Sequence, residues 1–288
     1  MNYAHDFHAG NFADVFKHIF LTRILHYLAR KPAPLRYIET HAGSGLYDLA
    51  GPQAERTAEW RTGVLRLAAS PLEPEAQALV EPYLDIVKPL IGADSPLYPG
   101  SPLIASALLR PQDKMLACEL HPDAFQRLRA NLRRDRRAKA MEIDGYTGLM
   151  AFVPPVERRG LVLIDPPFED AAEFDRLARA LPAAARKWTS GVFMLWHPVK
   201  DRAAVGAFAR ALAEGFAASG VKSVLRIELQ IDDVRPQGAL TRCGLIIANP
   251  PFTLEAEARR ILPGLSQRLA RSLEAPRADY LVEWLGRN

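Results

Sequence analysis

The chain has 288 residues, enough for one large domain or two small ones. Hydrophobic residues make up 49% of it and charged residues 24%, which excludes a largely disordered chain, and the net charge of +4 is too small to indicate a nucleic-acid partner by itself. No apolar run approaches the roughly 18 residues that a membrane span needs, and the first residues lack the apolar region of a secretory signal, so we expect a cytoplasmic protein.

Two long segments of helical period flank the first predicted strand. The first 34 residues look helical from about Asn11 to Arg30, and an apolar strand follows at residues 35–40. Residues 48–100 separate this strand from the next one, and their apolar residues again recur with helical spacing. We therefore predict an N-terminal helical extension over 1–34 and a helical insertion over about 48–100, within one domain that spans 1–288.

The rest of the chain alternates between apolar runs rich in β-branched residues and segments of helical period. The strand candidates lie at 114–120, 138–144, 160–165, 191–197, 223–231 and 242–249, with a further short candidate at 279–285. Helical segments such as 121–135 and 172–188 lie between most of them, which is typical of a parallel sheet covered by helices on both faces. The polar stretch 232–241 suggests a hairpin, so we predict a mostly parallel, seven-stranded α/β sheet with one late antiparallel strand.

Both cysteines, Cys118 and Cys243, lie inside apolar runs that are predicted strands. This placement indicates buried thiols in a reducing compartment rather than a disulfide framework or a metal cluster. We therefore expect no metal ligand among them.

A cluster of positive charge occupies residues 127–139. One acid, Asp135, stands there among seven cations, which are Arg127, Arg129, Arg133, Arg134, Arg136, Arg137 and Lys139. Such a cluster either neutralises the phosphates of a nucleic acid or forms an ordinary solvated helix face. The choice depends on independent evidence for a nucleic-acid site.

The carboxyl ends of the first strands carry residues suited to a ligand, and this edge is where open α/β sheets bind ligands. Gly43 and Gly45 follow the first strand and form either a simple turn or a loop that approaches a ligand closely. Glu119 ends the second strand, where it is either an ordinary acid or an acceptor for two ribose hydroxyls. Asp144 and Gly145 end the third, where the acid can accept from an exocyclic amine and the glycine leaves room for a flat ring.

The fourth strand ends in Asp165-Pro166-Pro167-Phe168. Asp165 and a backbone carbonyl of the prolines can accept hydrogen bonds from an amine on a planar ring, and Phe168 can stack on a base drawn out of its helix. Asp165 can also accept the proton that the amine loses. An isolated copy of this motif is often only a turn that ends a strand. In register with the three preceding strand ends, it predicts an active site and resembles a class I S-adenosylmethionine-dependent methyltransferase with a Rossmann-like fold.

A second prolyl motif stands at Asn249-Pro250-Pro251-Phe252. It follows the predicted hairpin strand, and no carboxylate-ended strand comes shortly before it. We therefore expect Asp165 to be the catalytic residue and Asn249 to end a strand at the rim of the same face.

Several motifs together resemble the bacterial 23S ribosomal RNA adenine-N6 methyltransferase J family. They lie at residues 5–18, 39–47, 98–105, 118–122, 144–145 and 158–168, and the resemblance runs along the full length of the chain. It implies methyl transfer from S-adenosylmethionine to the N6 amine of one adenine in 23S ribosomal RNA. We also expect no membrane association, no obligate protein partner and a monomer.

The resemblance also implies site roles. The cofactor pocket would be lined by His18, His41, Gly43, Ser101, Glu119, Asp144, Gly145 and Asp165. Catalysis would rest on Asp165, Pro166, Pro167 and Phe168, and the RNA substrate would lie near Tyr3, Asn11 and Lys17. Ser101 precedes Pro102, so its hydroxyl suits a helix N-cap as well as, or instead of, the cofactor.

Two positions depart from related patterns. Phe168 stands where members of the family carry tyrosine, so a phenolic hydroxyl is not essential here. Asp165 stands where many enzymes that methylate amines use asparagine, and an ionised aspartate is a stronger acceptor that costs more to bury.

Other functions remain open from the residues. A DNA adenine-N6 methyltransferase or a ribosomal RNA guanine-N2 methyltransferase would use the same prolyl motif. An NAD-dependent oxidoreductase would need a third glycine where Asp48 stands. A non-catalytic RNA-binding protein would have no need for Asp165.

Overall fold

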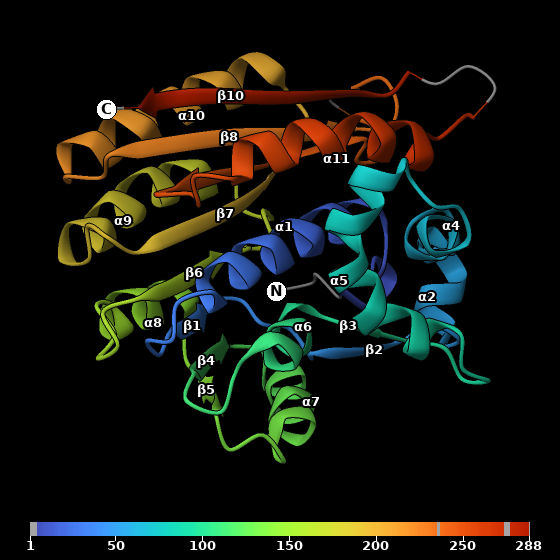
Figure 1. Cartoon of the computed structure of the whole chain (residues 1–288), viewed down its shortest axis with the longest axis horizontal. Helices are drawn as coiled ribbons and strands as arrows, with labels where there is room; N and C mark the ends of the chain where they lie inside the picture. Colours follow the sequence, from blue (N-terminus) through green and yellow to red (C-terminus); the bar gives the residue numbers. More distant parts are fainter. Residues whose placement is uncertain (1–4, 235–236, 274–276, 288) are drawn as a thin grey trace.

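The computed structural model describes residues 5–234, 237–273 and 277–287. Eight strands form one sheet, and a separate pair of short strands lies beside it (Figure 1). From one edge of the large sheet to the other, the order is β10 (Asp279–Arg287), β8 (Ser223–Gln230), β9 (Arg242–Ala248), β7 (Val192–Pro198), β6 (Gly160–Ile164), β1 (Arg36–Glu39), β4 (Lys114–Glu119) and β5 (Ala138–Glu142).

The strand directions confirm the predicted sheet with one addition. Strands β5, β4, β1, β6 and β7 are parallel to one another. Strand β9 lies between β7 and β8 and runs antiparallel to both, and β8 and β9 are the two strands of the predicted hairpin. The prediction of seven strands is wrong by one, because β10 pairs antiparallel with β8 from Ser223 to Gln230. The short candidate at 279–285 is therefore a full edge strand.

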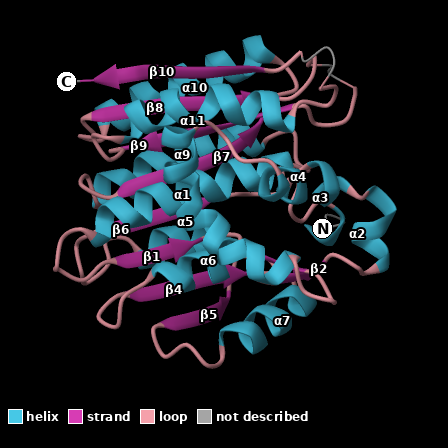
Figure 2. Ribbon diagram, turned by 45° about the vertical axis from the view of Figure 1, so that its right-hand side comes forward, coloured by secondary structure: helices cyan, strands magenta, loops and turns pink. Residues whose placement is uncertain are grey.

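Helices cover both faces of the sheet (Figure 2). In β6, Leu161 and Leu163 belong to one hydrophobic core, and Val162 and Ile164 belong to the other, as the alternation of side chains along a strand requires. The first core includes residues of α1 (Phe12–Ala29), α5 (Pro74–Ile91), α6 (Ser101–Leu108), α7 (Pro122–Leu132) and α11 (Leu254–Leu269). The second includes residues of α8 (Gly145–Phe152), α9 (Glu173–Lys187) and α10 (Arg202–Ala218). Both cysteines are buried as free thiols.

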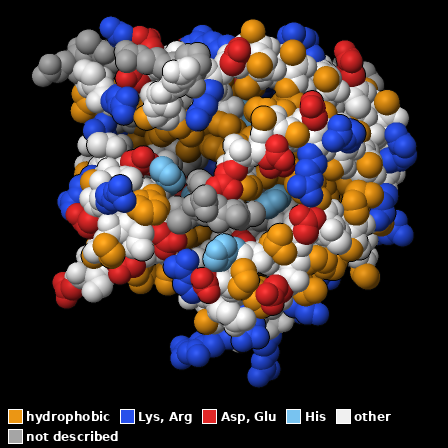
Figure 3. Space-filling view, turned by 180° about the vertical axis from the view of Figure 1, so that it is seen from behind, with side chains coloured by type: hydrophobic (Ala, Val, Ile, Leu, Met, Phe, Trp, Pro, Cys, Tyr) orange, Lys and Arg blue, Asp and Glu red, His pale blue; other side chains and the backbone are white. Residues whose placement is uncertain are grey.

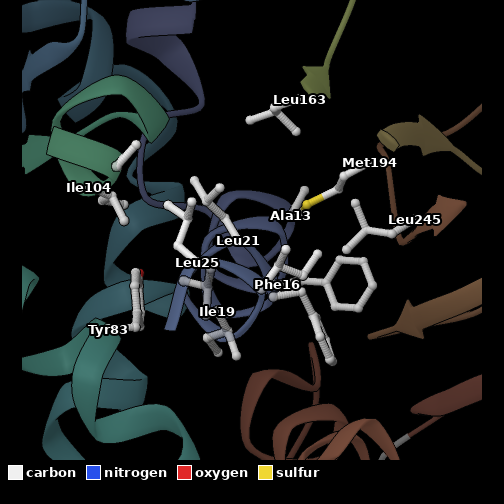
Figure 4. Close-up of a cluster of buried hydrophobic side chains, with 14 of the residues drawn as sticks. Ala13, Phe16, Ile19, Leu21, Leu25, Tyr83, Ile104, Leu163, Met194 and Leu245 are labelled. Atoms are coloured by element: carbon white, nitrogen blue, oxygen red, sulfur yellow. The ribbon is translucent and has the colours of Figure 1, made fainter. Parts of the chain in front are cut away.

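Helix α1 is the central helix of the first layer rather than an appended extension. Its apolar residues point in different directions around the helix axis (Figure 4). They contact the sheet on one side, where Leu163, Met194 and Leu245 lie, and the insertion and α6 on the other, where Tyr83 of α5 and Ile104 of α6 lie. A helix that is apolar all round is stable only when it is buried, so α1 depends on both neighbours.

The predicted insertion is a group of helices held between two short strands. It contains α2 (Pro52–Thr57), α3 (Glu59–Thr62), α4 (Val64–Ala69) and α5, and it begins and ends with β2 (Leu46–Asp48) and β3 (Leu97–Pro99). These strands pair antiparallel with each other, so the insertion leaves and rejoins the domain at one place. Its longest helix, α5, packs on α1 and α11.

The two prolyl motifs lie at opposite ends of the strands, since the first follows the carboxyl end of β6 and the second lies near the amino end of β7. Because β9 runs antiparallel to β7, its last residue, Ala248, pairs with Phe193 near the start of β7. Asn249 then donates hydrogen bonds from Nδ2 to the carbonyl oxygens of Thr189 (2.8 Å) and Gly191 (2.9 Å). The expectation that this motif lies at the rim of the same face is therefore wrong, and Asn249 fastens the loop before β7.

Candidate active site

A cavity of about 790 Å³ lies at the carboxyl ends of the parallel strands. The order of the strands reverses between β1 and β6, which is the place where open α/β sheets bind ligands. The walls come from the loops after β1, β4, β5 and β6, from the short 3-10 helix η1 (His5–Phe7) and from the first turns of α1. Histidine side chains gather near the middle of this side of the molecule, with acidic and basic side chains around them (Figure 3).

The structure brings most of the predicted site residues together. The cavity is lined by Asn11, Lys17, His18, His41, Gly43, Ser101, Glu119, Asp144, Gly145, Asp165, Pro166, Pro167 and Phe168. Tyr3 lies outside the described residues, so its predicted contact with RNA stays a prediction.

Glycines are required where the loops of the cavity touch. Gly43 has a φ of 61°, and its amide donates to Glu119 Oε2 at 2.8 Å. A Cβ atom on Gly145 would lie 2.3 Å from the carbonyl oxygen of Thr40 and 2.8 Å from the ring of His41. The room that Gly145 leaves is thus taken up by the loop after β1, which closes against the loop after β5.

Replacing Gly145 with alanine should weaken binding of the cofactor expected from the sequence, S-adenosylmethionine, by about 10- to 100-fold, because the two loops must separate to make room for the alanine Cβ. Calorimetry on the purified variant would measure this loss. Gly206→Ala in α10 is the matched control, since the nearest atom to its Cβ would be a flexible Arg210 nitrogen at 3.6 Å. Unchanged binding by the Gly145 variant would contradict the assignment of this contact.

Two carboxylates at the strand ends fix the backbone and retain capacity for a ligand. Glu119 accepts from the amides of Gly43 (2.8 Å) and His121 (2.7 Å), one on each oxygen. A carboxylate offers about four lone-pair positions, so others remain for hydroxyl groups. Asp144 caps α8 by accepting from Thr147 N at 2.8 Å. Burial alone would raise its pKa, but the bonds from Thr147 and the charge of Arg176 hold that pKa below its usual value.

Two histidines of the cavity, the buried His18 and the partly buried His41, are neutral at physiological pH. Burial lowers the pKa of His18 to about 3 and that of His41 to about 4. Nδ1 of His18 lies 2.7 Å from the hydroxyl of Tyr98, and its Nε2 is buried without a hydrogen-bond partner among the described residues. A buried polar atom without a partner costs free energy, which fits an atom reserved for a ligand.

Ser101 does not cap its helix. Gly100 occupies the N-cap position of α6, and the Ser101 hydroxyl instead donates to Oε1 of Glu39 at the end of β1. Of the two roles predicted for Ser101, the N-cap is therefore wrong. Glu39 also accepts from the hydroxyl of Tyr37 at 2.8 Å, and burial raises its pKa to about 8.

Glu39 should make the stability of the fold depend on pH. Its pKa is raised from 4.5 when the chain is unfolded to about 8 when folded, so the native state holds a proton that the unfolded state releases. This contribution is complete below pH 4.5 and is lost as the pH rises through 8. Between these limits, the free energy of unfolding should fall with pH in the unsubstituted protein and fall less in Glu39→Gln. Urea unfolding at several pH values measures this, and equal slopes would refute it.

Two carboxylates and an ammonium form a chain of charged groups at the cavity. Lys17 Nζ lies 2.5 Å from Oδ2 of Asp165 and 3.1 Å from Oδ1 of Asp14. Burial would lower the pKa of Lys17, but the two carboxylates outweigh it and hold that pKa well above its usual value. Oδ2 of Asp14 also contacts His5 Nε2 at 2.9 Å and accepts from Gly10 N at 3.0 Å. Lys17 therefore lies against the predicted catalytic carboxylate and not on a phosphate-facing surface.

Asn11 is mainly a structural residue. Its Oδ1 caps α1 by accepting from Ala13 N (2.9 Å) and Asp14 N (3.0 Å), and its Nδ2 donates to Glu59 at 3.0 Å. Three of the four hydrogen-bonding positions of the amide are thus in use. The predicted contact of Asn11 with RNA has little support from this geometry.

Phe168 is held in a strained backbone conformation among other rings. Its φ is 50°, which is unusual for a bulky residue and characteristic of functional sites. Its ring centroid lies 5.2 Å from that of Phe174 and 5.8 Å from that of Trp196. Phe168 and Trp196 thus give the cavity an apolar wall close in sequence to Asp165, and Phe174 packs against the Phe168 ring.

Comparison with known proteins matches this geometry. The family model "Ribosomal RNA large subunit methyltransferase D, RlmJ" matches residues 32–285. The chain is 37% identical over 286 residues to "Ribosomal RNA large subunit methyltransferase J" of Escherichia coli strain K12, and the match covers 99% of both proteins. The chain belongs to this family. It is also 37% identical over 287 residues to the protein of the same name in Haemophilus influenzae, again over 99% of both.

A solved structure agrees with the family. The crystal structure of protein LPL1258 from Legionella pneumophila superposes with a TM-score of 0.83 at 35% identity, and the match covers 96% of this chain and 98% of that one. The resemblance inferred from the motifs is thereby confirmed, and the chain is a ribosomal RNA methyltransferase rather than an oxidoreductase. In the part of the chain that the structure describes, no helix is both long and apolar enough to cross a membrane.

Sequence reasoning missed several residues of the site. Asp14 lies in the motif at residues 5–18. It stands three positions before Lys17, a spacing that suits an ion pair on one helix face. Tyr146 follows Asp144-Gly145 directly, and the guanidinium of Arg176 lies 3.8 Å from its ring centroid. Arg176 carried no signal, because only the packing of α9 against α8 brings it to the cavity.

Proposed function

We propose that the chain transfers the methyl group of S-adenosylmethionine to the N6 amine of one adenine in 23S ribosomal RNA. The observation that carries this proposal is the position of Asp165. Its carboxylate lies in the same cavity as the ribose-suited Glu119, next to a rigid Pro-Pro turn and an aromatic wall.

The residues of the cavity fit the cofactor. The loop at Gly43 packs against Glu119, whose remaining lone pairs suit the hydroxyls of a ribose. The unpartnered Nε2 of His18 suits a polar group of the same ligand. When bound, S-adenosylmethionine supplies an electrophilic methyl group.

Asp165 then directs the target amine. The lone pair of the adenine amine is delocalised into the ring, which makes the nitrogen a poor nucleophile. Lys17 holds Oδ2 of Asp165, so Oδ1 is left to accept a hydrogen bond from the amine. A carbonyl of the Pro166–Pro167 segment accepts a second one, since the prolines fix its direction and offer no competing N–H.

The proton balance also involves Asp165. As the bond between nitrogen and methyl forms, the bond from the methyl to the sulfonium sulfur would break and the neutral thioether would leave, while the nitrogen gains positive charge and must release one of its two protons. Asp165 accepts that proton directly or passes it to water. Phe168, in contact with Trp196, offers a surface on which the flipped base can stack.

The test is methylation with labelled S-adenosylmethionine of three substrates: unmodified 23S ribosomal RNA, duplex DNA with adenine targets and RNA whose only amine targets are guanines. We expect label in the 23S RNA alone, at N6-methyladenine after digestion. Label in duplex DNA but not in 23S RNA would overturn the proposal in favour of a DNA enzyme. Label in guanine would favour guanine-N2 transfer.

We further propose that the protein acts as a monomer in the cytoplasm and that residues 1–288 form one methyltransferase domain. The strand pair β2–β3 supports the single domain, because it returns the insertion to the sheet at the place where it left. Light scattering at the concentration of the activity assay tests the monomer.

A further inference from the structure

The positive cluster of the sequence is divided by the structure into two groups. Arg137 is used internally: its Nε and Nη2 donate to Asp135 at 2.8 Å, and Nη2 donates to the carbonyl oxygen of Ser106 at 2.8 Å. The hydrogen bonds from Arg137 lower the pKa of Asp135 to about 2. The one acid of the cluster is therefore already neutralised and does not offset the other cations.

The remaining cations face solvent. Those with exposed side chains are Arg127, Arg129, Arg133, Arg134, Arg136 and Lys139. Arg127 pairs with Asp6 at 3.1 Å, and Arg129 lies 5.9 Å from the ring centroid of Phe125. Within the described chain, the side chains of Arg133, Arg134 and Arg136 have no hydrogen bond, ion pair or ring contact. These three residues are called the distal arginines below.

The distal arginines are connected to the cavity by α7. Arg127 and His121, near the start of the helix, line the cavity itself. Asn131 donates from Nδ2 to the carbonyl oxygen of Ser44 at 2.8 Å, which fastens the helix to the loop after β1. The distal arginines follow at the end of the helix, at the lower end of the molecule in Figure 1, where Figure 3 shows Lys and Arg side chains gathered.

The charge of this surface selects an extended anion rather than a small one. Arginines that lie side by side without a carboxylate partner repel one another, and a row of phosphates relieves that repulsion. Five residues of helix, about 8 Å, separate Arg127 from Leu132, the last residue of α7, and the distal arginines follow it, so a ligand must reach from the cavity along the helix. A polynucleotide strand whose target base enters the cavity has this form.

We propose that the distal arginines bind the phosphate backbone of the substrate RNA outside the active site and so hold the target base at the cavity. This inference rests on the proposed function, since it takes the ligand in the cavity to be part of an RNA. The arginines supply affinity without reading sequence, because contacts to phosphate carry no base information.

The experiment compares the unsubstituted protein with the triple variant R133E/R134E/R136E on full-length, unmodified 23S RNA. With full-length RNA, KM should rise at least about tenfold at 0.15 M salt, and kcat should stay within about twofold. The slope of log Kd against log salt should fall by about 2, since each lost phosphate contact removes roughly 0.7. Between 50 and 200 mM salt, the unsubstituted protein should thus lose about 20-fold more affinity than the variant.

The matched control is R186E/R210E/K222E, which makes the same change of charge at three exposed positions that do not line the cavity. It should leave the salt slope and KM unchanged. Equal effects of both triple variants would mean that only net charge matters and would overturn the proposal. The proposal would also be overturned if R133E/R134E/R136E lost methylation only on assembled ribosomal particles, because the surface would then bind protein. Thermal unfolding, and R133Q/R134Q/R136Q as a milder variant, separate lost binding from lost folding.

The two proposals can fail separately. If the unsubstituted protein methylates no RNA, the proposed function is wrong. If it methylates 23S RNA and the distal variant does so with the same KM and salt slope, only the role of the distal arginines is wrong.

Discussion

Replacing Asp165 with alanine should lower kcat for methyl transfer by about a thousand-fold and leave S-adenosylmethionine binding within a few-fold of its original strength. In the proposed function the carboxylate orients the amine and accepts its proton, and both effects act on the reacting nitrogen. The proposed cofactor, by contrast, would be held mainly by the loops after β1, β4 and β5, which line the cavity. Single-turnover assays with labelled cofactor measure the first effect, and calorimetry measures the second.

The chain contains its own control for this variant. Asn249 begins the second prolyl motif, but it lies at the opposite edge of the sheet and bonds the loop before β7. Asn249→Ala should lower the free energy of unfolding by about 1–3 kcal/mol, since two hydrogen bonds and an accommodating residue at a φ of 50° are lost. The folded variant should keep its kcat. If it lost activity as severely as Asp165→Ala, the assignment of catalysis to one motif would fail.

Replacing Lys17 with methionine should damage both folding and catalysis. Lys17 and Asp14 are buried, and the side chain of Asp165 is only 17% exposed, so the change leaves two carboxylates facing each other without a cation. Removing one partner of a buried ion pair typically costs about 3–5 kcal/mol. We therefore expect a large fall in the free energy of unfolding and a loss of kcat of about 100-fold, because Oδ2 of Asp165 is no longer held.

A second substitution separates the two effects. In Lys17→Met combined with Asp14→Asn, one carboxylate is neutralised, and the asparagine can still accept from the amide of Gly10. Stability should recover in part, as urea unfolding would measure, and kcat should not. Recovery of both would mean that Lys17 acts only through stability and does not position Asp165. If Lys17→Met alone changed neither the free energy of unfolding nor kcat, the ion pair would be unimportant.

The strand pattern predicted most of the fold because β-branched runs and helical segments alternate along the chain. It also predicted the hairpin that makes β9 antiparallel. The same prediction implies the true position of Asn249, because an antiparallel strand ends beside the amino ends of its neighbours and not beside their carboxyl ends. The role of α1 was missed for a different reason. Helical period indicates that a segment is helical, but an apolar surface all round the helix indicates burial only when its neighbours are known.

The site was predictable where residues follow strands, because the ends of parallel strands meet at one edge. Glu119, Asp144 and Asp165 reached the same cavity for this reason. The pairing of Lys17 with Asp165 joins residues 148 positions apart, and no local pattern predicts it. Glu39 was hidden because its carboxyl group lies in the core beneath the cavity, where only the packing of Ser101 and Tyr37 shows its surroundings.

The burial of α1 sets a limit on how small this enzyme can become. Its first turns carry Lys17, whose ammonium group contacts the proposed catalytic carboxylate of Asp165. The helices of the insertion cover the side of α1 that faces away from the sheet. A shortened protein that joins residue 48 directly to residue 100 would keep every strand of the large sheet. It would nevertheless open one side of α1 to water and let the Lys17 side chain hydrate. The insertion would thus support the proposed catalytic residue through the burial of α1.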